Sequence, residues 1–342
     1  MFEITEEIRE RIEKLQQKYA SSGQDMLSYL DGLLFARYLT YWDYIELDTL
    51  LTLQKPRTNF PDEKIFIVYH QITELYFLLI QEELDQVIEA GKDIAKKELL
   101  KRLNRIVNYA RHLTDSFDVM TYGMDREQFL NFRMALLPAS GFQTASYREI
   151  EFKITDLHNL LDKGKEQKGL QELPPAEQYP HLYWKAGNRE LETGEKTLTL
   201  RMFEEKYDEH FLRLIRRMRD TNLRQLRLRA PAALANDPEV IAQYKALDLS
   251  LNVFWRLSHY KAAARYLVKE PEVIKATGGT NWQQYLPPRF QRVIFFPELW
   301  SKEEKAEWGK AWVLKLFEEQ VESKWQDQLK QLQDVSQEEE AQ

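Results

Sequence analysis

Residues 61–90 read PDEKIFIVYHQITELYFLLIQEELDQVIEA, and this stretch decides the fold class. Pro61 and the two acidic residues after it are typical of a helix N-terminus, where proline's missing N–H has no partner to lose and negative charge is favoured. Large, mostly apolar side chains then recur about once per helical turn. They are Phe66, His70, Leu75, Leu79 and Leu84. The stretch predicts one long helix that ends near Ala90.

The same helical period runs through most of the chain. Ile4, Ile8, Ile12 and Leu15 form an apolar stripe, and Thr5 followed by two acidic residues marks a helix start. No segment alternates long enough for a strand, and 12 glycines and 12 prolines are too few for a sandwich or barrel. Further helices are expected at 95–118, 143–163, 201–228, 236–269 and 303–333. We therefore predict an all-α fold, a bundle of long helices.

The helical pattern is interrupted without long linkers. The breaks fall at Gly123, 138–141, 174–175, Pro231 and 271–288. None of them is a Gly/Ser-rich spacer of the kind that separates independent domains. We expect a single domain over residues 1–335 with an excursion near 165–200, followed by a disordered acidic tail at 336–342.

The chain contains no cysteine. This excludes disulfide scaffolds, zinc ribbons, iron–sulfur clusters and cysteine nucleophiles, and it fits a reducing compartment. The acidic N-terminus lacks the basic and apolar regions of a signal peptide. No apolar run approaches the roughly 18 residues that a membrane span needs. The sequence predicts a cytoplasmic protein without membrane association.

A net charge of −7 and a pI near 5.6 oppose nucleic-acid binding. One local exception is 213–229, which holds seven arginines. Leucine and isoleucine residues interleave with them at near-helical spacing, so we interpret this segment as a solvated helix face that pairs with nearby acids. An RNA-binding patch is the alternative.

Any metal or cofactor chemistry must use histidines and carboxylates. None of the six histidines has Glu three residues before it, and HExxH, P-loop, GxGxxG and GxSxG motifs are absent. His70 shares a helix face with Phe66. His259 precedes three alanines, whose small side chains would let a flat cofactor approach the helix with the imidazole as iron ligand. Each histidine could equally be a hydrogen-bonded core residue, and alanines are also the best helix formers.

Two loops are rich in small and hydroxyl residues, 138–143 and 276–280. Both could present backbone N–H groups to a ligand, and both could be simple turns. Arg133, just before the first loop, could hold a carboxylate with two hydrogen bonds. A surface arginine is the alternative interpretation.

Taken together, these segments resemble the tryptophan 2,3-dioxygenase family. Six stretches match in order and spacing over most of residues 40–300. They are Tyr41-Trp42-Asp43-Tyr44, 66–77, 129–143, Trp255 to His259, Thr277-Gly278-Gly279 and Phe295-Phe296-Pro297-Glu298-Leu299-Trp300. The resemblance implies an all-α bundle that encloses a haem pocket, with one haem b per subunit.

The resemblance assigns cofactor roles to a few residues. It implies that His259, in the family's Trp255-Arg-x-x-His context, is the proximal ligand of the haem iron. Ser140 and Gly141 match the loop over the distal side of the haem. His70 matches the distal histidine that receives the indole N–H, and we expect it to orient the substrate rather than act as an obligatory base.

The remaining matches concern the substrate. Arg133 would bind the carboxylate of L-tryptophan and Thr277 its ammonium group, while Phe66 and Phe129 would form apolar walls around the indole. Tyr41 and Tyr44 fall where a neighbouring subunit closes the pocket. The resemblance therefore implies an intertwined homotetramer.

The implied reaction inserts both atoms of O2 across the indole C2–C3 bond of L-tryptophan and gives N-formyl-L-kynurenine, the first step of tryptophan catabolism by the kynurenine route. The sequence departs from the family pattern at Tyr69, Ala276 and 280–282. These changes favour, as an alternative, a related haem enzyme that oxidises or hydroxylates another aromatic amino acid or indole derivative. A non-catalytic helical scaffold that binds a partner through 213–229 is a third hypothesis.

Overall fold

A computed structural model describes residues 4–23, 25–36, 38–163, 169–186, 188–190, 193–269, 272–273 and 287–310. These residues are mostly helical, and the all-α prediction is confirmed. The sheet within them is one antiparallel hairpin of two-residue strands, β1 (Val268–Lys269) and β2 (Glu272–Val273). The helices of eight or more residues are α1 (Glu6–Ser21), α2 (Met26–Phe35), α5 (Asp62–Ala90), α6 (Lys96–Asp115), α9 (Ala145–Ile154), α12 (Leu198–Met218), α15 (Pro238–Leu249) and α16 (Trp255–Leu267).

Shorter helices connect these long ones. The α-helical ones are α3 (Tyr41–Tyr44), α4 (Leu47–Leu50), α7 (Phe117–Tyr122), α8 (Arg126–Phe132), α10 (Pro175–Gln178), α11 (Tyr183–Ala186), α13 (Leu223–Arg229), α14 (Ala232–Ala235), α18 (Pro288–Gln291) and α19 (Lys302–Ala306). The 3-10 turns are η1 (Arg133–Leu136), η2 (Gly141–Gln143), η3 (Leu157–Leu160), η4 (Leu170–Glu172), η5 (Tyr179–His181) and η7 (Pro297–Leu299), and η6 (Ser250–Phe254) is a π-helical turn.

The chain divides into two compact units, residues 1–54 and 55–342. The first contains α1 to α4. Its first helix begins as predicted, because the Thr5 side chain caps it by accepting from the backbone N–H of Ile8. The expectation of one domain over 1–335 stays a prediction, and the tail 336–342 lies outside the described residues.

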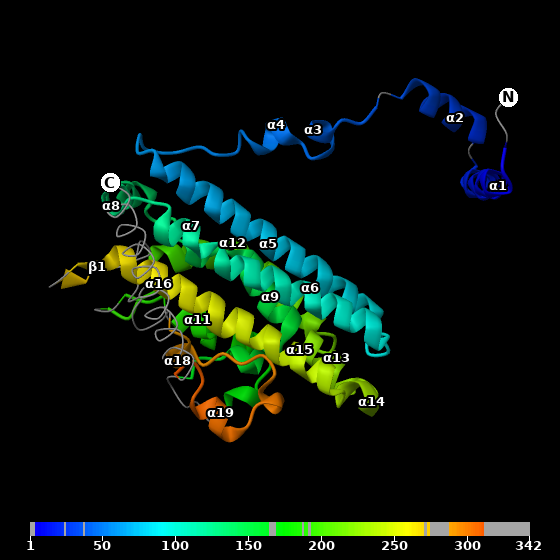
Figure 1. The fold of residues 1–342 in the computed structure, drawn as a ribbon. Coiled ribbons are helices and arrows are strands. Elements are labelled where there is room, and N and C mark those ends of the chain that lie inside the picture. The colour runs from blue at the N-terminus through cyan, green and yellow to red at the C-terminus, as the bar shows by residue number, and fades with distance from the viewer. Residues whose placement is uncertain are drawn as a thin grey trace, which may run out of the picture. The chain divides into compact units, whose positions relative to one another are not determined.

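The second unit is built around α5, which packs against α6 and α9 (Figure 1). The helix spans the predicted range. Its start is fixed by the buried Glu63 carboxylate, which accepts from the N–H groups of Arg57 at 2.6 Å and Thr58 at 2.7 Å. It ends at Gly91, whose φ of 73° favours glycine.

The face that α5 buries differs from the one that the recurring apolar residues of its sequence predict. Leu75 is half exposed, whereas Phe77 and Ile80 are fully buried. The physical reason is rotation: nine residues at about 100° each place Leu75 opposite Phe66 on the helix. The core of this unit contains Phe77, Ile80 and Leu84 of α5 with Leu103 and Ile106 of α6.

The segment predicted as one helix at 236–269 is α15, η6 and α16 in succession. Asp237 caps α15 and Pro238 occupies its first turn, as both residue types favour. The fully buried Asp248 carboxylate then ties this helix to the segment 295–300 through the N–H groups of Phe295 and Phe296 and the indole of Trp300.

Three predicted helices have different bounds. The one expected at 143–163 ends at Ile154, because Thr155 is extended and its hydroxyl donates to the Phe295 carbonyl at 2.6 Å. The one at 201–228 is broken into α12 and α13, and the Asn222 side chain caps the second. Within 301–310, the helix expected at 303–333 is α19, and the rest lies outside the described residues.

The arginines of 213–229 largely face acidic partners. Arg213 pairs with Glu209, Arg229 with Asp220, and Arg224 and Arg227 both pair with Glu298. The pairing with acids is as expected, but the face is only partly solvated, because Arg227 is buried. None of the helices in the described part of the chain combines the length and the apolar character that a bilayer span requires.

Candidate functional site

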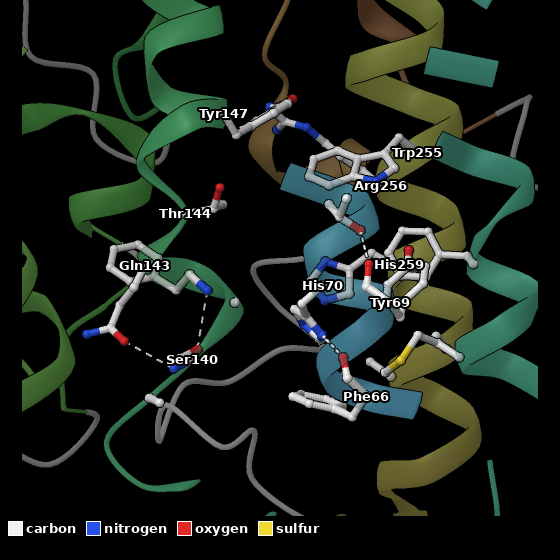
Figure 2. Close-up of a pocket in the computed structure, with 18 of the residues that line it drawn as sticks. Phe66, Tyr69, His70, Ser140, Gln143, Thr144, Tyr147, Trp255, Arg256 and His259 are labelled. Atoms are coloured by element: carbon white, nitrogen blue, oxygen red, sulfur yellow. Dashed lines mark hydrogen bonds between the residues drawn. The ribbon is translucent and has the colours of Figure 1, made fainter. Parts of the chain in front are cut away.

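A cavity of about 560 Å³ lies in the second unit. Its walls come from α5, α7, α8, α9, α11 and α16 and from the loop 139–144. Figure 2 shows this loop on one side and α5 and α16 on the other, with Tyr147 and Arg256 at one end and Phe66 at the other. The volume falls within the roughly 300–1,000 Å³ typical of small-molecule and cofactor pockets.

His70 enters the cavity from α5. Its Nδ1 lies 2.7 Å from the Phe66 carbonyl oxygen. Because a carbonyl can only accept, Nδ1 carries the proton and Nε2 is left as an acceptor. Burial lowers the pKa of His70 below its ordinary value, which keeps the ring neutral. The loop approaches this nitrogen closely, since a side chain added at Gly141 would sit 3.7 Å from Nε2.

His259 enters from α16, and its ring stacks on Phe117 with the centroids 5.6 Å apart. Burial in the protein, and then the proximity of His70, lower the pKa of His259 to about 4, so its imidazole is neutral. His259 is nevertheless accessible from the cavity, because it is an exposed residue that lines the cavity wall. Within the described residues, neither ring nitrogen has a hydrogen-bond partner.

Aromatic side chains form the end of the cavity near Phe66. The Phe66 ring lies 4.2 Å from that of His70 and 6.1 Å from that of Phe129. Phe129 in turn packs 4.8 Å from Tyr266. Such walls suit a flat apolar ring and offer it edge and face contacts.

The opposite end of the cavity is charged. Arg148 donates to Glu151 at 3.0 Å and to the Tyr183 hydroxyl at 2.6 Å. Arg256 donates to the second Glu151 oxygen at 3.2 Å and to the Tyr147 hydroxyl at 3.3 Å. We call these five residues the arginine cluster. All five are buried.

The structure brings most of the sequence-predicted site residues to this cavity. Those that line it are Phe66, His70, Phe129, Ser140, Gly141, Trp255 and His259. Arg133 is buried at the end of α8, with its pKa lowered by burial, and it is not among the described residues that line the cavity. Tyr41 and Tyr44 are exposed in the first unit. Thr277 lies outside the described residues.

Sequence reasoning missed several residues of the cavity wall. They include Tyr147, Arg148, Tyr183 and Arg256 of the arginine cluster, and also Tyr69, Thr73, Phe117, Met120, Trp184 and Asn188. Arg148 and Glu151 follow one another at helical spacing and could have been noticed as a pair. The contributions of α11 carry no sequence signal, because they depend on how the excursion near 165–200 folds back onto α9.

The residues present fit a haem. The cavity has apolar side walls, and the small Ala262 and Ala263 lie one turn beyond the neutral His259. Six buried polar atoms of wall residues have no hydrogen-bond partner within the described chain, as expected of a cavity in which a bound group supplies partners. These atoms are Tyr69 Oη, Thr144 Oγ1, Arg148 Nε, Trp184 Nε1, Asn188 Oδ1 and Trp255 Nε1. The described residues contain no group of three or more His, Cys, Asp or Glu that could hold a bare metal ion.

Comparison with known proteins agrees with this chemistry. A family model described as tryptophan 2,3-dioxygenase matches residues 33–180. The tryptophan 2,3-dioxygenase of Ruegeria sp. (strain TM1040) is 30% identical over 285 residues, and that of Exiguobacterium sibiricum is 30% identical over 282. The enzyme of Bacillus thuringiensis subsp. konkukian is 29% identical over 280 residues. Each alignment covers 78% of this chain and 92% of the relative. The chain therefore belongs to the tryptophan 2,3-dioxygenase family.

Proposed function

We propose that this protein is a haem b enzyme, with one haem per subunit, that inserts both atoms of O2 across the indole C2–C3 bond of L-tryptophan and yields N-formyl-L-kynurenine. Family membership supports the reaction class. The observation that carries the proposal is the presence of two neutral histidines, His70 and His259, on different helices of one cavity.

The two histidines differ in what their ring nitrogens can do. His259 has no protein partner among the described residues and is available as the axial ligand of the iron. A bound haem would supply the redox-active iron that O2 chemistry requires. His70 has its Nδ1 proton committed to the Phe66 carbonyl, so its Nε2 can accept the indole N–H and orient the ring. Trp255, one turn before His259, forms part of the wall beside the cofactor.

The indole of the substrate lies at the end of the cavity near Phe66. Phe66 and Phe129 hold the indole between apolar surfaces and exclude water from it. Ser140 and Gly141 close the distal side, where the Ser140 side chain and that of Gln143 cap the turn reciprocally.

The ends of the amino acid are held by residues that the family resemblance supplies. Arg133 binds the carboxylate and Thr277 the ammonium group. Tyr41 and Tyr44 of a neighbouring subunit complete the pocket in a cytoplasmic homotetramer. Dry aromatic walls with ionic groups at their rim suit a zwitterion that carries a large apolar ring.

The test uses haem-loaded, chemically reduced protein mixed with L-tryptophan and O2, and the product is weighed by mass spectrometry. The proposal predicts a gain of two oxygen atoms with formation of N-formyl-L-kynurenine. A product that gains one oxygen atom, or a requirement for peroxide, would instead identify a related haem oxidase or hydroxylase. Protein that stays colourless after haem is supplied would contradict both.

A further inference from the structure

The arginine cluster carries more positive than negative charge. It contains two guanidinium groups, on Arg148 and Arg256, and one carboxylate, on Glu151. Their exposed fractions are 8%, 6% and 0%. Isolated charge buried in protein is costly unless it is paired. Among the described residues, one positive charge of the cluster is thus left without an opposing ion at the wall of the cavity.

The neighbouring groups do not remove this excess. Burial raises the pKa of the Tyr147 and Tyr183 hydroxyls above the ordinary value, so both stay neutral. The adjacent ionic group, Lys185 and Lys196 with Glu204 and Asp208, is balanced within itself. Among the described residues that line the cavity, the carboxylate is that of Glu74, which is solvent-exposed and interacts with His70 on α5.

Two N–H donors near the cluster lack an acceptor in the described chain. They are Arg148 Nε and the indole Nε1 of Trp184, and the Arg148 guanidinium lies 5.3 Å from the centre of the Trp184 ring. Both side chains line the cavity. A buried donor without an acceptor is costly, and a native structure rarely keeps one unless a ligand or water completes it.

We propose that the arginine cluster, with Trp184 beside it, binds a carboxylate of the group that fills the cavity. A single carboxylate would neutralise the excess charge and accept from the unpartnered N–H groups. This inference rests on the proposed function, because that function supplies two carboxylate sources: a haem propionate and the amino-acid substrate.

The first experiment measures the affinity of the folded protein for haem and for its dimethyl ester, in which both propionates are uncharged, by absorbance titration. In the wild type, haem should bind about tenfold more tightly than the ester. Arg148→Gln, which leaves the cluster neutral, should reduce this preference to near unity. Glu151→Gln, which raises the cluster's charge, should increase it.

The opposite direction of these two changes separates ligand binding from structure. A merely structural cluster would weaken haem and ester binding together in both variants and leave their ratio constant. Arg102→Gln is the matched control, since Arg102 pairs with the buried Glu83 between α5 and α6 and does not line the cavity. Its preference for haem over the ester should equal that of the wild type.

The second experiment compares L-tryptophan with tryptamine, which lacks the carboxylate, on the haem-loaded variants. A preference for L-tryptophan that falls in Arg148→Gln and rises in Glu151→Gln would support the site and identify the substrate as the carboxylate source, in place of its assignment to Arg133. Preferences that are unchanged in both experiments would overturn the site alone. Folded wild-type protein that binds neither haem nor the ester would overturn the proposed function and the site with it.

Discussion

Two buried ionic centres in this protein carry one excess charge each, and they are built differently. Asp248 accepts four hydrogen bonds, from the backbone of Phe295 and Phe296 and from the side chains of Asn252 and Trp300. No ion pair to it occurs among the described residues. The arginine cluster instead borders a cavity, and its Arg148 Nε has no acceptor among the described residues.

The difference separates a structural charge from a charge that serves a ligand. Around Asp248 every oxygen is satisfied by the chain itself, so the carboxylate fastens 295–300 to α15 and needs nothing more. At the cavity, the described part of the chain leaves His259 and the arginine cluster incompletely paired. We expect substitutions at the cavity to change ligand binding and substitutions at the Asp248 tether to change stability.

The largest effect is expected at His259, the proposed iron ligand. His259→Ala should abolish haem retention, because the described chain offers no second free imidazole on that wall, while the free energy of unfolding of the apoprotein changes little. Haem content and the absorbance spectrum measure this. His210→Ala is the control, since His210 is exposed and pairs with Glu149 outside the cavity. A variant that kept normal haem content would remove His259 as the ligand.

The second effect is a dependence of stability on pH that comes from Asp248. Burial raises the pKa of Asp248 to about 6 from an ordinary 3.8, so the folded state holds this proton more tightly than the unfolded state. Protonated Asp248 therefore contributes about 3 kcal/mol to the free energy of unfolding. This contribution is fully present below the unfolded pKa and is lost as pH rises through about 6.

Denaturant unfolding of the wild type and Asp248→Asn between pH 4 and 7 isolates this group. The free energy of unfolding of the wild type, relative to that of the variant, should fall as pH rises across this window. Groups such as Glu63, whose pKa is lowered in the fold, contribute the opposite slope equally to both proteins. If the difference in unfolding free energy between the two proteins did not change with pH, Asp248 would have an ordinary pKa in the fold, which would contradict its description as a buried structural charge.

A smaller effect is expected for substrate binding. Arg133→Ala should weaken L-tryptophan binding by about 2 kcal/mol, because a charge-assisted contact made through two N–H groups is lost. The KM for L-tryptophan and the affinity for haem are measured together. Arg133→Lys, which keeps the charge without the planar fork, should recover part of the loss. An unchanged KM with normal haem content would exclude Arg133 from the substrate site.

The smallest effect is expected at Thr155, which contacts the segment 295–300 beside Asp248. Thr155→Val removes the hydroxyl that donates to the Phe295 carbonyl at 2.6 Å and should cost about 1 kcal/mol of unfolding free energy. Haem affinity should stay unchanged, because Thr155 does not line the cavity. A loss of haem affinity that exceeds the loss of stability would show that the tether also shapes the ligand site.

The parts of the fold that the sequence predicts well have local causes. The start of α1 follows from its cap Thr5, and the two ends of α5 coincide with Pro61 and Gly91. The end of α9 could not be predicted, because the contact that stops the helix joins Thr155 to Phe295, 140 residues away.

The site divides in the same way. The contexts of His70 and His259 are legible in the sequence, and both residues line the cavity. The arginine cluster is not legible, because Glu151, Tyr183 and Arg256 meet only through tertiary packing over separations of 32 to 105 residues. No local pattern indicates that their charges fail to cancel.

The most direct test of the central claim is a crystal structure of the haem-loaded protein. We expect the iron to be bonded to a ring nitrogen of His259, with His70 on the opposite face of the haem and a carboxylate hydrogen-bonded at Arg148 or Arg256. Iron bonded to His70, or a haem outside this cavity, would contradict it.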